Sequence, residues 1–309
     1  MATLRESASD TFTVGSYKLA SLFAQVTPGP LAYATARLVG YTASASLQSR
    51  RGIIERHIKR VRPNISRRDL RSAVQGAFDS YARYYVESFR LPGLPRSVVE
   101  NGMTLEGFEA VIEGLSHGKG VILGLPHLGG WEWAGRWLAE QGYKVSVVVE
   151  PLQPPELFEW FTDLRTELGM NVVPLGDGVA AAVLSALRDN HIVCLLCDRD
   201  LRGDGLPVRF FGEDTTLPAG PVTLGIRSGA PVIPAAVYFT DRYNGHHAVV
   251  RPPIDLSRSG RLRDDVAAGT QRLASELEGL IARAPDQWHM FQPNWPSDPG
   301  YAEMRAAQH

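Results

Sequence analysis

From Gly120 onward, short apolar runs alternate with segments long enough to form helices, and this rhythm restricts the fold more than any other feature. The apolar runs are "GVILGLP", "KVSVVVE", "MNVVPL", "HIVCLLCD", "APVIPAAVYF" and "HHAVVRPPI". Some are separated by segments suited to crossover helices, including "WEWAGRWLAEQ", "PELFEWFTDLRTEL" and "VAAAVLSALRDN". Parallel strands need such crossovers. The pattern therefore predicts an α/β fold with a single sheet and helices on both faces.

Residues 1–100 are expected to form a helical region that belongs to the same domain as an α/β core at 101–309. Within it, "ISRRDL" supplies Ser66 as a helix cap, with Asp69 three residues later. The uncharged run from Leu19 to Ala36 contains "TPGP", which predicts two helical pieces in place of a membrane-spanning helix. A chain of 309 residues without an internal repeat or linker does not demand a second domain.

The distribution of charge bears on the partners of the chain. A formal net charge of -1 gives no overall attraction to nucleic acid, so no nucleic-acid partner is expected. Between Arg50 and Arg71, however, nine Lys and Arg residues accompany only Glu55 and Asp69. This cationic segment is either a solvated helix face or a contact for anionic lipid headgroups. The opening "MATLRESASD" lacks the basic-then-apolar order of a secretion signal, which favours a cytoplasmic location.

Cys194 and Cys197 form a CxxC pattern inside the apolar run "HIVCLLCD". Residues three apart on a strand point to opposite faces, and no second Cys/His pair is present to complete a zinc site. No metal is therefore expected, and the two thiols are interpreted as buried strand residues in a reducing compartment.

Two further motifs suggest other chemistries. "GLSHG", at 114–118, matches the G-x-S-x-G elbow of serine hydrolases, but that elbow needs a strand before the serine, whereas a helical segment precedes Ser116. "GDGVAA" places Gly176 and Gly178 between a strand and a helix, with Asp198 about twenty residues beyond. This second pattern keeps a nucleotide-dependent enzyme of the NAD(P) type open as an alternative.

The stretch "GLPHLGGWEWAG" carries the strongest candidate for catalysis. It places His127 at the carboxyl end of a predicted strand, where open α/β sheets bind ligands, and Glu132 in the first turn of the next helix. Gly129 and Gly130 supply the turn, because glycine tolerates positive φ and lets other atoms approach closely. A carboxylate on Nδ1 would fix the tautomer and leave Nε2 as a general base. The N–H groups near these glycines are expected to hold an oxyanion.

Several blocks in order make the chain resemble the lipid A lauroyl/myristoyl-type acyltransferases and, more closely, their phosphatidylinositol mannoside acyltransferase relatives. The blocks are "LPHLGGWEWAG", "VVVEPLQPPELFEWFTDLRTELGMNVVPL", "CLLCDRDL", "FFGEDTTLPAGPVTLGIRSGAPVIP" and "DQWHMFQPNW", between about Tyr81 and Trp295. The resemblance implies transfer of a long acyl chain from acyl-CoA to a hydroxyl of a glycolipid. It implies no cofactor beyond acyl-CoA as co-substrate.

The resemblance also implies roles for individual residues. His127 matches the catalytic histidine that deprotonates the acceptor, Glu132 stands where Asp is more usual, and Asp198 stands where the mannoside enzymes tend to carry Glu. Either carboxylate could orient the histidine, and the sequence leaves that choice open. The implied substrate contacts, some of them to the sugar headgroup or its phosphate, are Glu150, Arg165, Arg199, Gly130 and Arg209.

The preferred interpretation is a peripheral acyltransferase at the cytoplasmic face of the cell membrane, acting on an anionic glycolipid. The acceptor predicted first is a mannose of a phosphatidylinositol mannoside. A lipid A-type enzyme that uses acyl carrier protein, the NAD(P) alternative and a non-catalytic lipid-binding role stay open. The position of the acylated hydroxyl, the acyl length and the oligomeric state are not determined by the sequence.

Overall fold

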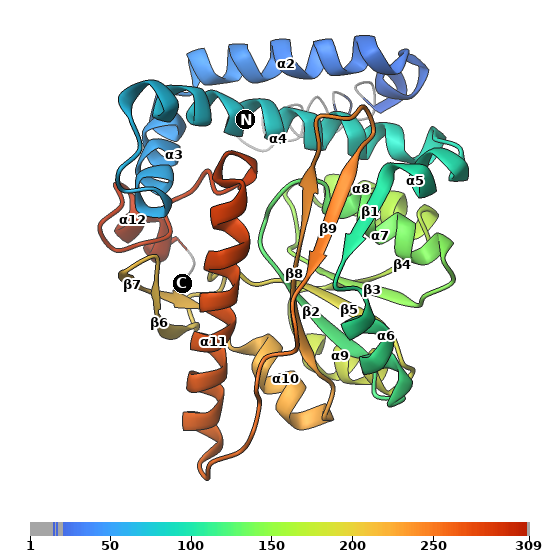
Figure 1. The fold of residues 1–309 in the computed structure, drawn as a ribbon, viewed down its shortest axis with the longest axis vertical. Coiled ribbons are helices and arrows are strands. Elements are labelled where there is room, and N and C mark those ends of the chain that lie inside the picture. Colours follow the sequence, from blue (N-terminus) through green and yellow to red (C-terminus); the bar gives the residue numbers. More distant parts are fainter. Residues whose placement is uncertain (1–14, 16, 18–20, 308–309) are drawn as a thin grey trace, which may run out of the picture.

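The computed structural model describes residues 15, 17 and 21–307, and its centre is a mixed sheet (Figure 1). Within the described residues this sheet has seven strands in the order β1-β9-β8-β2-β5-β3-β4. The strands are β1 (Met103–Glu106), β2 (Val121–Leu125), β3 (Val145–Val149), β4 (Met170–Pro174), β5 (Ile192–Leu196), β8 (Val232–Phe239) and β9 (His246–Val250). Neighbouring strands are parallel except for β8 and β9. The six apolar runs all form strands, which confirms the predicted α/β class.

Helices flank the sheet on both faces, because strand side chains alternate in direction. Leu123 and Leu125 of β2 share a hydrophobic cluster with α6 (Glu109–Ser116), α7 (Trp131–Glu140) and α8 (Pro155–Glu167). Ile122, between them, belongs to the cluster formed with α9 (Val179–Arg188), α10 (Gly220–Ser228) and α11 (Leu262–Arg283). The crossover segments predicted before β3, β4 and β5 are α7, α8 and α9.

Helices α2 (Gly29–Ser46), α3 (Gln48–Val61), α4 (Arg67–Arg90) and α5 (Arg96–Gly102) precede the sheet. Helix α2 begins directly after Pro28, as the "TPGP" break predicts, and the Ser66 hydroxyl accepts the N–H of Asp69 at 3.1 Å. Figure 1 shows α2 running along the outer side of α4. Among the helices of residues 21–307, none combines the length and apolar character needed to cross a bilayer. The first ten residues, where no secretion signal was found, lie outside the described residues.

Some elements were not predicted from the sequence. The segment around "FFGED" forms an antiparallel hairpin of β6 (Leu206–Phe210) and β7 (Glu213–Leu217), with Gly212 at φ 76° in the turn. Strand β1 at the sheet edge was also missed. Both cases involve short strands with polar or proline residues, for which an alternating apolar pattern is weak.

After α11 the chain forms a 3-10 helix, η2 (Pro285–Gln287), and then crosses the carboxyl end of β2 as an irregular segment before α12 (Tyr301–Ala306). Residues 287–298 are called the C-terminal strap below. His57 of α3 anchors the strap, since its Nδ1 lies 3.1 Å from the Met290 carbonyl and its Nε2 lies 3.0 Å from Asp298 Oδ2. Asp298 in turn accepts the backbone N–H groups of Asn294 and Trp295.

Candidate active site

His127 and Asp198 meet because the two strands that precede them end at the same level. Leu125, the last residue of β2, is the Cα partner of Leu196, the last residue of β5. Each functional side chain lies two residues beyond its strand end, at the carboxyl edge of the sheet. His127 Nδ1 is 2.6 Å from Asp198 Oδ1. The parallel register of β2 and β5 therefore builds a histidine–carboxylate pair.

The carboxylate of Asp198 is buried and held by several donors. Oδ2 accepts the His127 backbone N–H at 2.9 Å and the Trp288 Nε1–H at 2.7 Å, while Asn294 Nδ2 donates to the Asp198 carbonyl at 3.0 Å. Burial alone would raise the pKa of Asp198, but attraction to His127 in its protonated form and the hydrogen bonds from His127 and Trp288 outweigh it and lower that pKa. The carboxylate is thus ionised at neutral pH and accepts a hydrogen bond from Nδ1–H of His127. This leaves Nε2 of His127 as an acceptor.

A cavity of about 400 Å³ lies beside this pair, at the carboxyl edge of the sheet. His127 lines it with a side chain that is 15% exposed, whereas Asp198 behind it is fully buried. Four tyrosines from the N-terminal region form one wall of the cavity, namely Tyr17, Tyr81, Tyr84 and Tyr85. Trp131 stands next to the histidine with the ring centroids 5.9 Å apart. The imidazole is therefore the reachable member of the pair.

Glu132 occupies the first turn of α7, as predicted, but its carboxylate binds Arg165 and not His127. Arg165 of α8 places Nη2 at 2.5 Å and Nε at 3.0 Å from Oε1 of Glu132, and the Tyr84 hydroxyl donates to the same oxygen at 3.1 Å. Of the carboxylates that the sequence left as alternatives, Asp198 contacts the imidazole. Glu132 fixes a guanidinium that lines the cavity.

Glu150 and Arg199, both predicted substrate contacts, line the same cavity at the ends of β3 and β5. Arg199 Nη2 donates to Glu150 Oε2 at 3.0 Å, and its Nη1 donates to Gln292 of the strap at 2.8 Å. Glu150 is 44% exposed at the side chain, so the pair lies at the rim of the cavity. The sequence-predicted residues Glu150, Arg165 and Arg199 thus surround one space with His127.

The N–H groups of Gly129 and Gly130 do not themselves supply the oxyanion donors expected near this turn, because both already donate to backbone carbonyls. Gly129 donates to Gln287 at 3.0 Å and Gly130 donates to Val237 at 3.2 Å. Gly129 does adopt the positive φ of 60° expected of the turn. At Gly130, a Cβ would lie 2.6 Å from the His246 ring, so this glycine allows close packing against β9. It is absent from the lining of the cavity.

Within the part of the chain that the structure describes, Arg209 does not line the cavity that contains His127. It lies on β6 with 69% of its side chain exposed, 3.8 Å from Asp214 on the facing strand. Its backbone is bound to Gln271 of α11 by a pair of hydrogen bonds. The resemblance suggested a phosphate contact here, but the hairpin directs this arginine away from the lining of both cavities.

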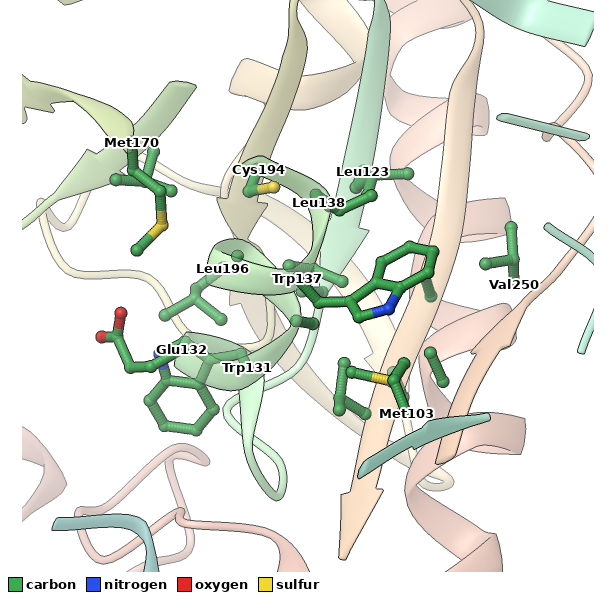
Figure 2. Close-up of a pocket in the computed structure, with 18 of the residues that line it drawn as sticks. Met103, Leu123, Trp131, Glu132, Trp137, Leu138, Met170, Cys194, Leu196 and Val250 are labelled. Carbon is green, nitrogen blue, oxygen red and sulfur yellow. The ribbon is translucent and has the colours of Figure 1, made fainter. Parts of the chain in front are cut away.

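A second, apolar cavity of about 90 Å³ lies between α7 and the sheet. Its lining includes residues from all seven strands of the large sheet, for example Leu123 and Leu125 on β2. Figure 2 shows Trp131 and Glu132 at one end of this cavity and Met103 and Val250 at the other. Trp131 and Arg165 line both cavities, so the apolar cavity adjoins the one that contains His127.

The competing motifs do not build sites of their own. Ser116 is the last residue of α6, before β2, and its hydroxyl donates to the Glu113 carbonyl at 2.6 Å, so the strand–serine–helix order of a hydrolase elbow is absent. The Asp198 carboxylate, which the dinucleotide alternative requires for a ribose, is engaged by His127 and Trp288. Strands β4 and β5 flank the glycine motif. In a dinucleotide-binding unit two such strands are neighbours, whereas here β3 separates them.

The two cysteines lie on opposite faces of the sheet, as predicted, although Cys194 is only partly buried and Cys197 lies one residue beyond β5. Cys194 packs in the cluster beneath α7, and Cys197 packs in the cluster on the opposite face. Burial raises the pKa of Cys194 to about 12, so this thiol stays protonated at neutral pH.

Sequence reasoning missed the contribution of the strap and of α4. Trp288 and Asn294 bind Asp198, and Tyr84 binds Glu132, from positions far away in the chain. The block "DQWHMFQPNW" contains both strap residues, and its tryptophan, histidine and amide side chains are the signal that could have found them. No local periodicity links this block to β5.

The chain is similar to known acyltransferases. Residues 12–297 match the model of a family described as bacterial lipid A biosynthesis acyltransferase. Phosphatidylinositol mannoside acyltransferases from strains of Mycobacterium tuberculosis are 38% and 40% identical to it, over 75% of this chain and 72% of theirs. A protein of the same description from Mycolicibacterium smegmatis is 37% identical, over 73% of each chain.

Proposed function

This chain belongs to the bacterial lipid A biosynthesis acyltransferase family and is an acyltransferase, and we propose that it moves a long-chain acyl group from acyl-CoA to a mannose hydroxyl of a phosphatidylinositol mannoside. The observation that carries the proposal is the His127–Asp198 pair, with Nε2 directed to a cavity that adjoins an apolar one. The names of the relatives support the choice of acceptor.

The pair supports a one-step transfer. Nε2 of His127 takes the proton of the acceptor hydroxyl while the hydroxyl oxygen attacks the thioester carbonyl. Asp198 stabilises the imidazolium that forms. When the tetrahedral intermediate collapses, the C–S bond breaks and the imidazolium returns the proton to the leaving thiolate. A thioester is already activated, so no covalent enzyme intermediate is required. The thiol of Cys194, whose pKa is raised to about 12, is unsuited to provide one.

The apolar cavity is the proposed place for the acyl chain. Strands in a sheet are spaced about 4.8 Å apart, so a lining drawn from all seven strands extends over about 29 Å. Small residues keep that passage open, because Ala235 and Ala248 line it from the sheet and Gly135 lines it from α7. A hydrocarbon chain gains about 0.8 kcal/mol for each methylene that it buries. The adjoining cavity then places the thioester next to His127.

The polar rim of the larger cavity is the proposed place for the acceptor headgroup. Glu150 and Arg199 offer a carboxylate acceptor and guanidinium donors, which suit sugar hydroxyls, and Arg165 offers a charge for the phosphate. The four tyrosines line the same cavity. These groups support an acceptor that carries both sugar hydroxyls and a phosphate.

Helix α2 is the proposed membrane contact. Its small residues Gly29, Ala32, Ala36, Gly40 and Ser44 are buried, whereas Leu31 and Leu38 on its other side are 57% and 63% exposed. Exposed Leu22, Phe23 and Val26 precede it in the chain. Arg62, Arg67, Arg68 and Arg71, between α3 and the start of α4, are also exposed. An apolar helix face with cations nearby is the pattern of attachment to an anionic lipid surface.

We expect the double change Leu31→Glu and Leu38→Glu to lower the affinity for vesicles of phosphatidylcholine with phosphatidylinositol by at least about tenfold. Each leucine contributes about 1.5–3 kcal/mol when buried, and 1.4 kcal/mol corresponds to a factor of ten. Sedimentation with the vesicles measures the effect. Ile112→Glu is the matched control, because Ile112 is 53% exposed on α6, at the far end of the molecule from α2 in Figure 1. Equal losses for both variants would contradict the assignment of α2.

Mass spectrometry of the lipid product tests the function directly. The protein is mixed with a defined phosphatidylinositol mannoside and palmitoyl-CoA, and we expect the acceptor to gain the mass of one palmitoyl group while free CoA thiol appears. Palmitoyl-acyl carrier protein serves as the competing donor, and a lipid A precursor serves as the competing acceptor. Faster transfer from the carrier protein to the lipid A precursor would replace the proposal with the lipid A alternative, and lipid binding without any transfer would refute a catalytic role.

A further inference from the structure

His289 of the strap lies directly opposite His127. The strap pairs with the turn after β2 through an antiparallel bridge between Leu128 and Trp288, and the His289 N–H donates to the His127 carbonyl at 2.7 Å. In such a pairing, residues that face each other carry their side chains on the same side, with Cβ atoms about 5 Å apart. Both imidazoles line the larger cavity, and both contact Trp131, with ring centroids 5.9 Å and 5.5 Å away.

One nitrogen of His289 has no partner within residues 21–307. The residue is only 8% exposed, its Nε2 is 2.8 Å from the Ser80 hydroxyl, and its Nδ1 forms no hydrogen bond. The Ser80 hydroxyl needs an acceptor for its own hydrogen, and Nε2 is the acceptor beside it. With the Ser80 hydrogen assigned to this contact, Nε2 is the unprotonated nitrogen and Nδ1 carries an unused N–H.

The ring of His289 stays neutral across the physiological range. Burial lowers the pKa of His289 to about 3, and the charge of His127 acts in the same direction. Rings of Tyr81, Tyr84 and Trp131 surround it at 5.1 to 5.7 Å. A neutral imidazole in a low-dielectric site is a strong hydrogen-bond donor that adds no charge of its own.

We propose that the Nδ1–H of His289 is the donor to the thioester carbonyl oxygen, which becomes the oxyanion of the tetrahedral intermediate. This inference rests on the acyl transfer proposed above. It assigns an oxyanion donor after the N–H groups of Gly129 and Gly130 have been excluded, because those two donate to Gln287 and Val237. It also explains why a buried ring keeps an unpaired nitrogen, since the partner is supplied by the substrate.

The step then balances with one histidine on each side of the reacting carbonyl. His127 Nε2 receives the acceptor proton, the new C–O bond forms, and the carbonyl electron pair moves onto the oxygen that faces His289 Nδ1–H. As the C–S bond breaks, the oxygen regains its double bond and the proton passes from His127 to the thiolate. His289 donates a hydrogen bond throughout and never transfers its proton.

A pair of substitutions distinguishes this role from a structural one. His289→Phe keeps a ring but removes the N–H, and we expect it to lower kcat by about 10²- to 10³-fold while KM for acyl-CoA changes little. His289→Asn places an amide N–H near the position of Nδ1, and we expect it to recover much of that loss. Ser80→Ala removes the hydroxyl that sets the tautomer but keeps the ring and its N–H, and we expect a smaller loss of kcat than in His289→Phe.

Infrared spectroscopy of bound acyl-CoA labelled with ¹³C at the thioester carbonyl provides a second readout, in a His127→Asn background that prevents turnover. We expect the carbonyl band to lie at lower frequency when bound than when free, to return to the free value with His289→Phe, and to stay low with His289→Asn. An unchanged kcat in His289→Phe, or a loss confined to KM for the acceptor, overturns the proposal. If the parent protein transfers no acyl group, the proposed function fails, and the infrared result still decides whether His289 binds the thioester.

Discussion

Replacing His127 with alanine is expected to lower kcat for acyl transfer by about 10²- to 10⁴-fold, the usual contribution of a general base. The reason is that Nε2 of His127 is the basic atom that Asp198 orients toward the larger cavity. KM for acyl-CoA should change little, because the acyl chain is proposed to lie in the apolar cavity, whose lining does not include His127. The rate of CoA thiol release in the presence of the acceptor measures the effect.

The matched control is His127→Asn. Its amide N–H can replace Nδ1–H as the donor to Asp198 Oδ1, so the buried carboxylate keeps its partner while the base is lost. We expect this variant to melt at a temperature close to that of the parent protein and to be as inactive as His127→Ala. Turnover at the parental rate in either variant would remove His127 from the mechanism.

Asp198→Asn is expected to lower kcat by about 10⁴-fold, as the loss of the correct histidine tautomer does in a serine protease triad. Asp198 accepts from His127 Nδ1, from the His127 backbone and from Trp288, whereas an asparagine has one oxygen and presents N–H hydrogens in place of the other. Because folding lowers the pKa of Asp198, its ionised form also stabilises the fold at neutral pH. That contribution is lost as the pH falls below the ordinary aspartate value of about 3.9.

Glu132→Gln is the comparison that separates the two carboxylates. It weakens the pairing with Arg165 and leaves the His127–Asp198 contact in place, so we expect kcat to stay within about tenfold of the parent while the melting temperature falls. Steady-state kinetics and thermal melts of both variants check this division. If Asp198→Asn retained full turnover and Glu132→Gln abolished it, the orienting role would pass to Glu132.

The sheet and its crossover helices were predictable because their signals are local. Each apolar run in the second part of the chain became a strand, and the placement of His127 at a strand end followed from the run that precedes it. Glu132 in the first turn of a helix followed in the same way. These features depend on neighbours within a few residues, so periodicity and turn residues are sufficient to find them.

The partner of each carboxylate was not predictable, because it depends on the order of strands in space. Asp198 reaches His127 only because β5 lies next to β2 in the sheet, although β3 and β4 come between them along the chain. Glu132 reaches Arg165 through the docking of α8 beside α7, and the glycine N–H groups are consumed by a strap and a strand that lie more than a hundred residues later in the chain. Such contacts leave no spacing rule in the sequence.

Completion of the site depends on the C-terminal strap, which is synthesised after the sheet. Residues 287–298 leave the ribosome after every strand of the sheet, yet they supply the Trp288 and Asn294 hydrogen bonds to Asp198 and are themselves anchored to His57 of α3. A nascent chain that ends before the strap therefore carries its imidazole on an unbraced carboxylate and lacks the opposing ring of His289. The site is therefore complete only once residues 287–298 have closed onto α3.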